Sequence, residues 1–514
     1  MVSVQFGTVA RDVGRILRVV ALMPLASILV AVVVGEFYAV PAFVATAVVF
    51  AAVGTGLARR YADAPQPGKL HGMMIAAAAW AFVALLGSLP FLLVAGTIAY
   101  GPSWLATPEL GETTAAFLRP LHAVFESMSG YTSTGLTMAT DESTLPSSIQ
   151  WWRSFTEWVG GVGVIVLTVG ILARPGSGSL TLYESEARSE KIHPSIVSTA
   201  RDIWKLYLGF TVGAIALFFL AGMPVWDAIN HAMTAISTGG FSVHADSIGH
   251  YGEPLIEYAV IPVMVAGSIA FPVHYLIFKG EIRNLYADLQ TRWVFIWFTV
   301  GSAVLIAILS LRGFYGSLEE TIRIGLFQFV SATSNAGFGT ATLGGGTEQV
   351  WTADAILFLC LGMLTGAAAG STVGGLKLIR VITLVKGVRW RISGVFTPVS
   401  AVRRLQLGDR RLSADQAAKE IEEAAIVLVL WFAFLAIGIA VMLAILPTET
   451  PTEYVIFDVM SAQSTVGLDT GITGVEMPNA GKAVLIINMW VGRLEIIPVV
   501  VLLRGALLRF DLYR

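Results

Sequence analysis

Charged residues and cysteine are scarce in this sequence of 514 residues. Only 13% of the residues are Asp, Glu, Lys or Arg, whereas a soluble domain usually has about 25%. The lone cysteine, Cys360, excludes an intramolecular disulfide and a cysteine cluster for a metal, and it is expected to be a small core residue. A formal net charge of −2 gives no attraction to nucleic acid. Because 55% of the residues are hydrophobic, the chain is expected to be an all-α polytopic membrane protein.

Ten apolar stretches approach the length of about 20 residues that a helix needs to cross a bilayer. They lie at 15–34, 38–58, 72–98, 149–173, 202–222, 256–279, 292–311, 351–385, 421–445 and 482–508. The first follows three arginines, so a secretory signal peptide is the alternative interpretation. No A-x-A cleavage site precedes Glu36 and a second apolar run follows at once, which favours a retained helix.

Basic and acidic residues are divided between alternate connections. Lys and Arg gather in the segments 59–69, 174–205, 279–292, 377–419 and 504–514. Acidic residues prevail in the opposite connections, at Glu109, Glu112, Asp141, Glu142, Asp246, Glu253, Glu348, Glu449 and Glu453. Because basic loops tend to stay on the inner side of the membrane, both termini are predicted to be cytoplasmic.

One polar pattern occurs four times between apolar stretches. The copies are FESMSGYTSTGL (125–136), NHAMTAISTGGF (230–241), FQFVSATSNAGF (327–338) and FDVMSAQSTVGL (457–468). Each copy follows about ten residues that suffice for a short helix but not for a membrane span. The unit is therefore span, half-helix, glycine loop and span, and four copies predict pseudo-four-fold symmetry around a central pore, with two extra helices in front.

Four converging glycine loops are suited to a cation filter. Carbonyl oxygens can replace the water that a cation sheds, and glycine adopts the backbone angles that expose them. A single such motif would be an ordinary turn, but four in equivalent places favour a filter. Its predicted residues are Thr132, Ser133, Thr134, Gly135, Ser237, Thr238, Gly239, Gly240, Ser334, Asn335, Ala336, Gly337, Ser464, Thr465, Val466 and Gly467.

The stretch 351–385 is too long for one span and is interrupted by TGAAAGSTVGG at 365–375. Irregular backbone at membrane depth is tolerated only inside protein or beside water. The small residues in question are Gly366, Ala367, Ala368, Ala369, Gly370, Ser371, Thr372, Gly374 and Gly375. We interpret them as a movable intramembrane loop, and a kinked helix is the alternative. The next residue but one, Lys377, is expected to snorkel to the cytoplasmic interface.

Several other polar residues lie in or beside apolar stretches. Arg493 is an intramembrane charge with a functional role, or else one half of a structural pair with Glu495. Glu126 and Asp458 are expected to tie half-helices to neighbouring spans, and His122 and His231 to be held by hydrogen bonds. Asp469 is expected just outside the filter, where it concentrates cations or bonds the loop.

These motifs resemble the Trk/Ktr/HKT superfamily of potassium transporters, closest to the prokaryotic Trk-type membrane subunit. The similarity extends over nearly the whole chain and includes TGAAAGSTVGGLK, GRLEIIP and the linker SEKIHPSIVSTARDIWK (189–205). It implies that each repeat gives one filter glycine, and that K⁺ is bound by the backbone carbonyls of Thr134, Gly135, Gly239, Gly240, Ala336, Gly337, Val466 and Gly467. It also implies that the loop 365–375 obstructs the pore beneath the filter, beside Arg493.

The resemblance further implies K⁺ uptake through the plasma membrane of a prokaryote, with Gly135 favouring K⁺ over Na⁺. The implied partners are a second copy of the chain, a cytosolic nucleotide-binding regulatory subunit docked on the basic face 377–420, and membrane lipid. The chain itself carries no nucleotide-binding motif, and no cofactor other than the transported K⁺ is expected.

Alternatives of two classes stay open. Within the same fold, the chain could be Na⁺-selective or a symporter coupled to H⁺ or Na⁺. In a different class, the DTG triplet at Asp469 could belong to an intramembrane hydrolase, although a second catalytic aspartate in a matching context is missing, or the chain could be a scaffold without transport. The predicted domains are 1–68 (leading helices), 69–175, 176–281 and 282–390 (repeats 1 to 3), and 391–514 (linker and repeat 4).

Overall fold

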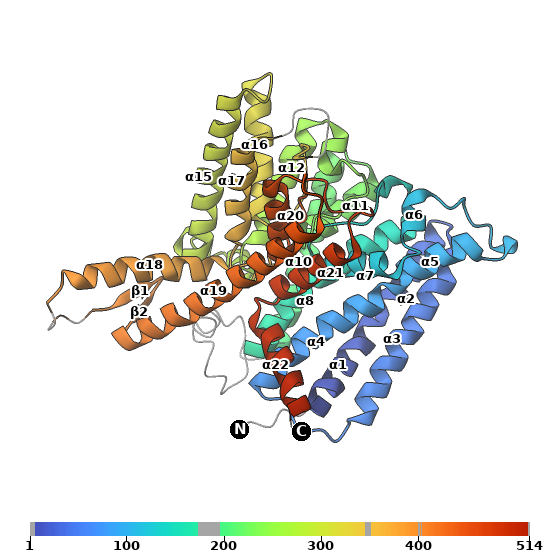
Figure 1. The fold of residues 1–514 in the computed structure, drawn as a ribbon, viewed down its shortest axis with the longest axis horizontal. Helices are drawn as coiled ribbons and strands as arrows, with labels where there is room; N and C mark the ends of the chain where they lie inside the picture. The colour runs from blue at the N-terminus through green and yellow to red at the C-terminus, as the bar shows by residue number, and fades with distance from the viewer. Residues whose placement is uncertain (1–5, 173–195, 345–350, 399–400, 402, 512–514) are drawn as a thin grey trace.

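The fold is that of an all-α polytopic membrane protein, as predicted, with one small β-hairpin (Figure 1). A computed structural model describes residues 6–172, 196–344, 351–398, 401 and 403–511. Segment 173–195, which holds the domain boundary at 175 and part of the predicted linker, lies outside the described residues, as do Glu348 and Arg514.

The leading part of the chain forms two antiparallel spans. Its elements are α1 (Phe6–Val20), α2 (Leu22–Val33), the 3₁₀ turn η1 (Phe37–Ala39) and α3 (Val40–Arg60). Glu36 precedes the turn, and its carboxylate accepts the backbone N–H groups of Ser147 and Ser148 at 2.7 and 2.9 Å. These two donors open a later helix, so the leading spans cap a helix of the first predicted repeat.

The first two predicted repeats contain the following elements. They are α4 (Lys69–Gly87), α5 (Leu89–Tyr100), η2 (Ser103–Leu105), α6 (Glu112–Ala116), α7 (Pro120–Tyr131), η3 (Glu142–Thr144) and α8 (Ser147–Leu172), then α10 (Ile196–Leu220), α11 (Val225–Ile236), η4 (Ser247–Tyr251), α12 (Pro254–Ser268) and α13 (Phe271–Phe278). The helices α7 and α11 are the predicted half-helices, each of 12 residues.

The third and fourth predicted repeats add α14 (Asn284–Ala287), α15 (Leu289–Arg312), α16 (Leu318–Thr333), α17 (Ala353–Leu364), α18 (Leu378–Val395), β1 (Leu405–Leu407), β2 (Arg410–Leu412), α19 (Ala414–Ile445), α20 (Thr452–Ser464), α21 (Asn479–Arg493) and α22 (Ile497–Asp511). The antiparallel strands β1 and β2 pair Leu405 with Leu412. Together with α18 and the first part of α19 they form an arm that projects from the helical body (Figure 1).

Three predicted spans are not straight helices. The stretch 256–279 bends by 104° between α12 and α13, and 482–508 bends by 112° between α21 and α22. The stretch 351–385 is split by non-helical backbone between α17 and α18. Among the described residues, six helices are long and apolar enough to cross a membrane, or eight if each bent pair is one span. Apolar composition does not reveal the first bend, because residues 265–273 around it carry no charge, whereas the second bend falls at the charged residues Arg493 and Glu495.

The interior is closely packed at the crossing of α1 and α3. A methyl group built on Gly14 would lie 2.7 Å from the carbonyl oxygen of Gly54. One built on Gly54 would lie 2.7 Å from the carbonyl oxygen of Gly14. The two backbones therefore touch directly, as at the small-residue contacts of membrane helices. Cys360 is 5% exposed and unpaired, which confirms its prediction as a core residue.

We expect Gly54→Val to lower the free energy of unfolding by about 2 kcal/mol, because the new side chain forces α1 away from α3. Thermal unfolding of the detergent-solubilised protein measures the effect. Gly56→Val is the matched control, since Gly56 lies two residues further along α3 and nothing comes within 4 Å of the position that a methyl group on it would take. Equal destabilisation by both variants would contradict the close crossing.

Candidate functional site

Four helix ends of the same construction form the core of the candidate site. The helices α7, α11, α16 and α20 each close with two backbone hydrogen bonds, in which one N–H group reaches back five positions and the N–H group before it reaches back three. The longer bonds are Thr134 N to Ser129 O, Gly239 N to Thr234 O, Ala336 N to Ser331 O and Val466 N to Ser461 O, at 2.9–3.0 Å. This is the Schellman pattern of helix termination.

The Schellman pattern needs one residue in the left-handed region at each helix end. Glycine usually supplies it, but here the residues are Ser133, Thr238, Asn335 and Thr465, with φ of +49°, +52°, +55° and +57°. Each of these conformations costs about 1–2 kcal/mol in a residue with a side chain. The predicted filter glycines follow two residues later, and Gly135, Gly240, Gly337 and Gly467 also have positive φ, between 70° and 102°.

The four loops contact one another in a closed cycle. A methyl group on Gly135 would collide with the carbonyl oxygen of Gly239, and one on Gly240 with that of Ala336. In the same way Gly337 faces the carbonyl oxygen of Val466, and Gly467 faces that of Thr134. The structure thus brings all four predicted filter loops together, and glycine is required at each contact because a side chain has no room.

Eight carbonyl groups of these loops have no hydrogen-bond donor in the described part of the chain. Among the described residues, no hydrogen bond reaches the carbonyl oxygens of Thr134, Gly135, Gly239, Gly240, Ala336, Gly337, Val466 or Gly467. Their residues are buried, apart from Gly135 and Gly337, which are partly exposed. Because buried backbone acceptors are nearly always paired, this set of oxygens has the chemistry of a binding site for a cation.

Side chains of the half-helices hold the loops in shape. The hydroxyl oxygens of Ser129 and Ser461 accept the N–H groups of Gly135 and Gly467 at 3.1 and 3.0 Å. One polar residue on each half-helix also bonds the outgoing limb of its own loop: Glu126 to Met138 N, His231 to Ser242 Oγ, Gln328 to Ala341 O and Asp458 to Thr470 N, at 2.8–3.2 Å.

These contacts decide several predictions. Glu126 does reach a neighbouring span through Arg153 of α8. Within the described part of the chain, Asp458 bonds only residues of its own loop, so the predicted tie to another span was wrong for Asp458. The histidine prediction is confirmed, since His231 is held on both ring nitrogens and His122 contacts Lys482 at 2.7 Å. Asp469 accepts the N–H of Gly471 at 2.8 Å and so bonds the loop.

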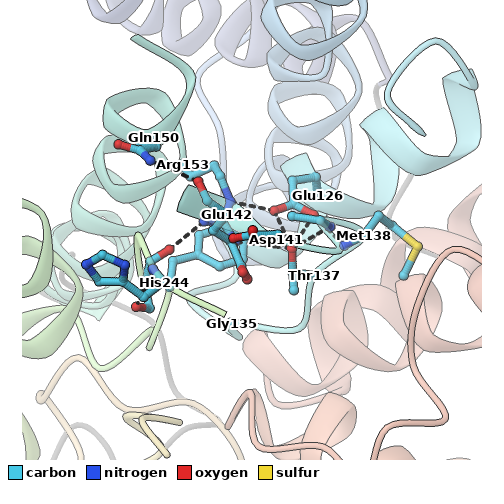
Figure 2. Close-up of polar contacts among 12 residues, drawn as sticks. Glu126, Gly135, Thr137, Met138, Asp141, Glu142, Gln150, Arg153 and His244 are labelled. Carbon is cyan, nitrogen blue, oxygen red and sulfur yellow. Dashed lines mark hydrogen bonds and ion pairs between the residues drawn. The ribbon is translucent and has the colours of Figure 1, made fainter. Parts of the chain in front are cut away.

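Arg153 is a residue of the site that the sequence reasoning missed. Its guanidinium is 1% exposed and lies 2.7 Å from Glu126 and 3.6 Å from Glu142. It also donates to the carbonyl oxygen of Ser242 at 2.7 Å, so it joins the first loop to the second. Figure 2 shows Arg153 pointing toward Glu126. The available signal was an arginine inside a predicted span, which is costly without a partner.

Glu157, one turn further along α8, was also missed. The available signal was again a charged residue inside a predicted span. The Glu157 side chain is fully buried behind the second loop, where its Oε2 accepts the N–H of Phe241 at 3.1 Å. A methyl group on Gly239 would collide with its carboxylate. The backbone oxygen of Glu157 accepts the hydroxyl of Ser133 at 3.2 Å, so Glu157 contacts two of the four loops.

The intramembrane loop 365–375 is non-helical and lies against the helix-end side of the predicted filter, so the alternative of a kinked helix was wrong. Thr372 Oγ1 donates to Ile236 O and Gly267 O at 3.1 and 3.0 Å and accepts from Thr238 Oγ1 at 3.2 Å. A methyl group on Gly374 would collide with Thr465.

The first half of the intramembrane loop, at Ala368 and Gly370, is bonded to the break between α12 and α13. Ala368 N donates to Ser268 O at 3.2 Å, and Phe271 N donates to Gly370 O at 3.1 Å. The loop is therefore packed on both sides, between the bend of one span and the underside of the filter loops.

Arg493 joins the intramembrane loop to the first filter loop. It donates to Thr372 O at 2.8 Å, Ser133 Oγ at 3.2 Å and Gly160 O at 2.9 Å. The alternative pairing with Glu495 was wrong, because Glu495 forms an ion pair with Arg380. Lys377 does not snorkel, since it is 3% exposed and donates to Val373 O.

Comparison with known proteins places this geometry in a family context. A family model described as the cation transport protein TrkH matches residues 41–507. An uncharacterised cation transporter of Methanocaldococcus jannaschii is 35% identical over 87% of this chain and 85% of its own length. The Trk system potassium uptake protein TrkH of Escherichia coli K12 is 30% identical over 88% of this chain and 89% of its own length. The crystal structure of the potassium transporter TrkH from Vibrio parahaemolyticus superposes with a TM-score of 0.80 at 26% identity, covering 97% and 99% of the two chains.

We expect Arg153→Gln to lower the free energy of unfolding by about 3–5 kcal/mol, because it leaves the carboxylate of Glu126 buried without a counter-charge. The double variant with Glu126→Gln should be more stable than Arg153→Gln alone. Thermal unfolding in detergent measures both. Arg312→Gln is the control, since its pair with Asp354 is exposed and should contribute less than about 1 kcal/mol. Strictly additive losses would contradict a direct Arg153–Glu126 interaction.

Proposed function

The chain belongs to the TrkH family of cation transport proteins, and from this premise we propose that it takes up K⁺ across the plasma membrane of a prokaryote. Membership of this family makes the chain a multi-pass membrane transporter and not an enzyme, so the hydrolase alternative at Asp469 was wrong. Relatives named as potassium uptake proteins support K⁺ as the transported ion.

One observation carries the proposal: eight backbone carbonyl oxygens without hydrogen-bond donors in the described structure lie on four loops that contact one another in a cycle. Neutral oxygens can replace the hydration shell of K⁺ without a fixed charge that would trap the ion. The half-helices also direct the negative ends of their dipoles toward these loops. K⁺ is thus proposed to bind the carbonyls of Thr134, Gly135, Gly239, Gly240, Ala336, Gly337, Val466 and Gly467.

The proposed path continues through the intramembrane loop. Its contacts with the second and fourth loops, and with the first through Arg493, support the proposal that it obstructs an ion leaving the filter. The loop residues 366–375 are proposed as the gate, with Arg493 adding electrostatic repulsion. The same proposal includes the domain organisation. Two leading helices (1–68) are followed by repeats 1 to 3 at 69–175, 176–281 and 282–390, and by a cytoplasmic linker with repeat 4 at 391–514.

The proposed partners follow from the resemblance and from the shape of the molecule. The arm made of α18, the hairpin and the start of α19 carries Arg389, Arg391, Arg404 and Arg411 and suits the docking of a cytosolic nucleotide-binding regulatory subunit. Homodimerisation and cytoplasmic termini belong to the same proposal. Exposed apolar residues on the spans, such as Leu29 and Leu311 with 69% and 88% exposure, suit contact with lipid. Transport is either channel-like or coupled to H⁺ or Na⁺.

We expect the chain to restore growth on low K⁺ to a bacterium that lacks its own K⁺ uptake, when expressed with a cognate regulatory subunit. Gly135→Ser should lower the K⁺/Na⁺ uptake ratio by roughly tenfold or more, because the side chain strains a positive φ and intrudes on the Gly239 carbonyl. Uptake of both ions into the same cells measures the ratio.

The control is Gly222→Ser, because Gly222 also has a positive φ of 106° but has nothing within 4 Å of its missing side chain. An unchanged ratio in Gly135→Ser would contradict the filter. Preferred uptake of Na⁺ by the unmodified chain would replace the proposed function by Na⁺ transport.

We expect Thr372→Val to raise K⁺ uptake severalfold, because it removes the hydroxyl that holds the intramembrane loop against Ile236, Gly267 and Thr238. Initial rates of rubidium uptake at equal amounts of membrane protein measure the effect. Thr383→Val is the control, since this threonine is equally buried and its hydroxyl has no partner among the described residues. Equal rates in both variants would argue against a gate at the loop.

A further inference from the structure

The side chain of Arg153 contacts two of the four loops at once, directly after their glycines. Its Nη2 donates to the hydroxyl of Thr137, which follows Gly135 by two residues, at 3.1 Å. Its Nη1 donates to the carbonyl oxygen of Ser242, which follows Gly240 by two residues, at 2.7 Å. The guanidinium therefore spans the junction between the first and the second loop.

The second loop also contacts the flat face of this guanidinium. The Cζ atom of Arg153 lies 4.1 Å from the centroid of the Phe241 ring, and Phe241 directly follows Gly240. At this distance the cation is attracted to the ring, and both side chains are 1% exposed. Because a guanidinium is planar, the position of the second loop depends on its shape as well as on its charge.

The positive charge of Arg153 is balanced on the side of the first loop. Its Nε donates to the carboxylate of Glu126 at 2.7 Å, and its Nη2 lies 3.6 Å from Glu142 (Figure 2). Glu126 in turn accepts the hydroxyl of Thr137 at 2.9 Å and the N–H of Met138 at 2.8 Å. Since the charge is paired in this way, the main effect of the guanidinium on the loops is to fix their geometry.

The junction that the guanidinium spans is also a contact between backbone groups proposed to bind the ion. A methyl group on Gly135 would lie 2.3 Å from the carbonyl oxygen of Gly239, so the two loops touch. The next junction is held differently, since the N–H of Gly339 donates to Ser247 Oγ at 3.1 Å and its carbonyl oxygen accepts the N–H of Gly249 at 3.0 Å. One junction thus has neutral bonds to a backbone segment, whereas the other depends on a single charged side chain.

We propose that Arg153 is a specificity-determining residue of the filter, because it holds the first and second loops at a spacing that suits K⁺ and not the smaller Na⁺. This inference rests on the proposed function. Its contacts are with the outgoing limbs and not with the eight carbonyl groups, so Arg153 is a positioning residue. A filter distinguishes ions by the size of its cavity or by the number and field strength of its oxygens. Either property changes when the carbonyl groups of Gly135 and Gly239 move relative to each other.

The K⁺/Na⁺ uptake ratio in the K⁺-uptake-deficient bacterium tests the inference, since a loss of protein from the membrane lowers the uptake of both ions alike. Arg153→Lys keeps a positive charge beside Glu126, but an ammonium lacks the planar fork that bonds Glu126, Thr137 and Ser242 together. We expect the ratio to fall roughly fivefold or more. An unchanged ratio would overturn the inference.

The matched control is Arg323→Lys, because Arg323 also forms a partly buried ion pair, with Glu257 of α12, but bonds no filter loop in the described structure. Its ratio should equal that of the unmodified chain, and an equal fall in both variants would contradict a specific role of Arg153. The double variant Arg153→Gln with Glu126→Gln leaves no unpaired charge and serves if Arg153→Lys folds poorly. Its ratio should also fall, because glutamine is too short to span the two loops, and an unchanged ratio would overturn the inference.

Thermal unfolding in detergent provides the same comparison without transport. A bound ion stabilises the folded protein, so KCl should raise the unfolding temperature of the unmodified chain more than NaCl does at the same ionic strength. Arg153→Lys should narrow this difference, and an equal difference in both proteins would overturn the inference even if cells show no uptake. Equal effects of the two salts on the unmodified chain, together with no K⁺ uptake, would contradict the proposed function itself and the inference with it.

Discussion

Buried carbonyl oxygens without donors are the constraint on which this structure depends. A backbone acceptor removed from water costs free energy unless something replaces the lost hydrogen bond. Here eight acceptors without donors in the described structure lie together on four contacting loops, six of them in buried residues and two in the partly exposed Gly135 and Gly337. The donors at the helix ends are already used in other hydrogen bonds and so do not pair with these carbonyl oxygens. The Schellman bonds use the N–H groups at the helix ends, and the polar residues of the half-helices bond the outgoing limbs of their own loops. A cation is the partner that we propose for these oxygens.

Buried charges are arranged around this neutral ring and not within it. Arg153 and Glu126 neutralise each other on the side where the loops leave the filter, whereas Arg493 lies on the side of the helix ends, with Glu157 behind the second loop. In the proposed function, neutral ligands contact the ion and fixed charges act on it from a distance. Such an arrangement allows the strength of binding and the height of the exit barrier to be set by different residues.

The sequence predicts much of the fold and of the candidate site, because the repeated loops carry local signals. Glycine at fixed positions after a short helix, and small residues at 365–375, mark irregular backbone wherever they occur. The bend of 104° could not be predicted in this way, since the residues around it are uncharged, and the bend of 112° is marked only by the charges of Arg493 and Glu495, which do not by themselves distinguish a bend from a straight span. Neither could the partners of the buried charges. Glu495 is two residues from Arg493 yet binds Arg380, and Arg153 binds a residue 27 positions earlier. Such pairings depend on tertiary packing, which spacing along the chain does not encode.

The arm has a mechanical consequence for the intramembrane loop. The helix α18 begins at Leu378, whose N–H still bonds Ala367 of the loop, and continues for 18 residues, or about 27 Å, toward the hairpin. No flexible linker separates the two, because Lys377 at the junction is buried and bonded to Val373. An α-helix resists compression and bending, so a tilt imposed on the far end of α18 is delivered as a pull on the backbone at Thr365–Leu376. The arm is thus joined directly, through α18, to the loop that we propose as the gate.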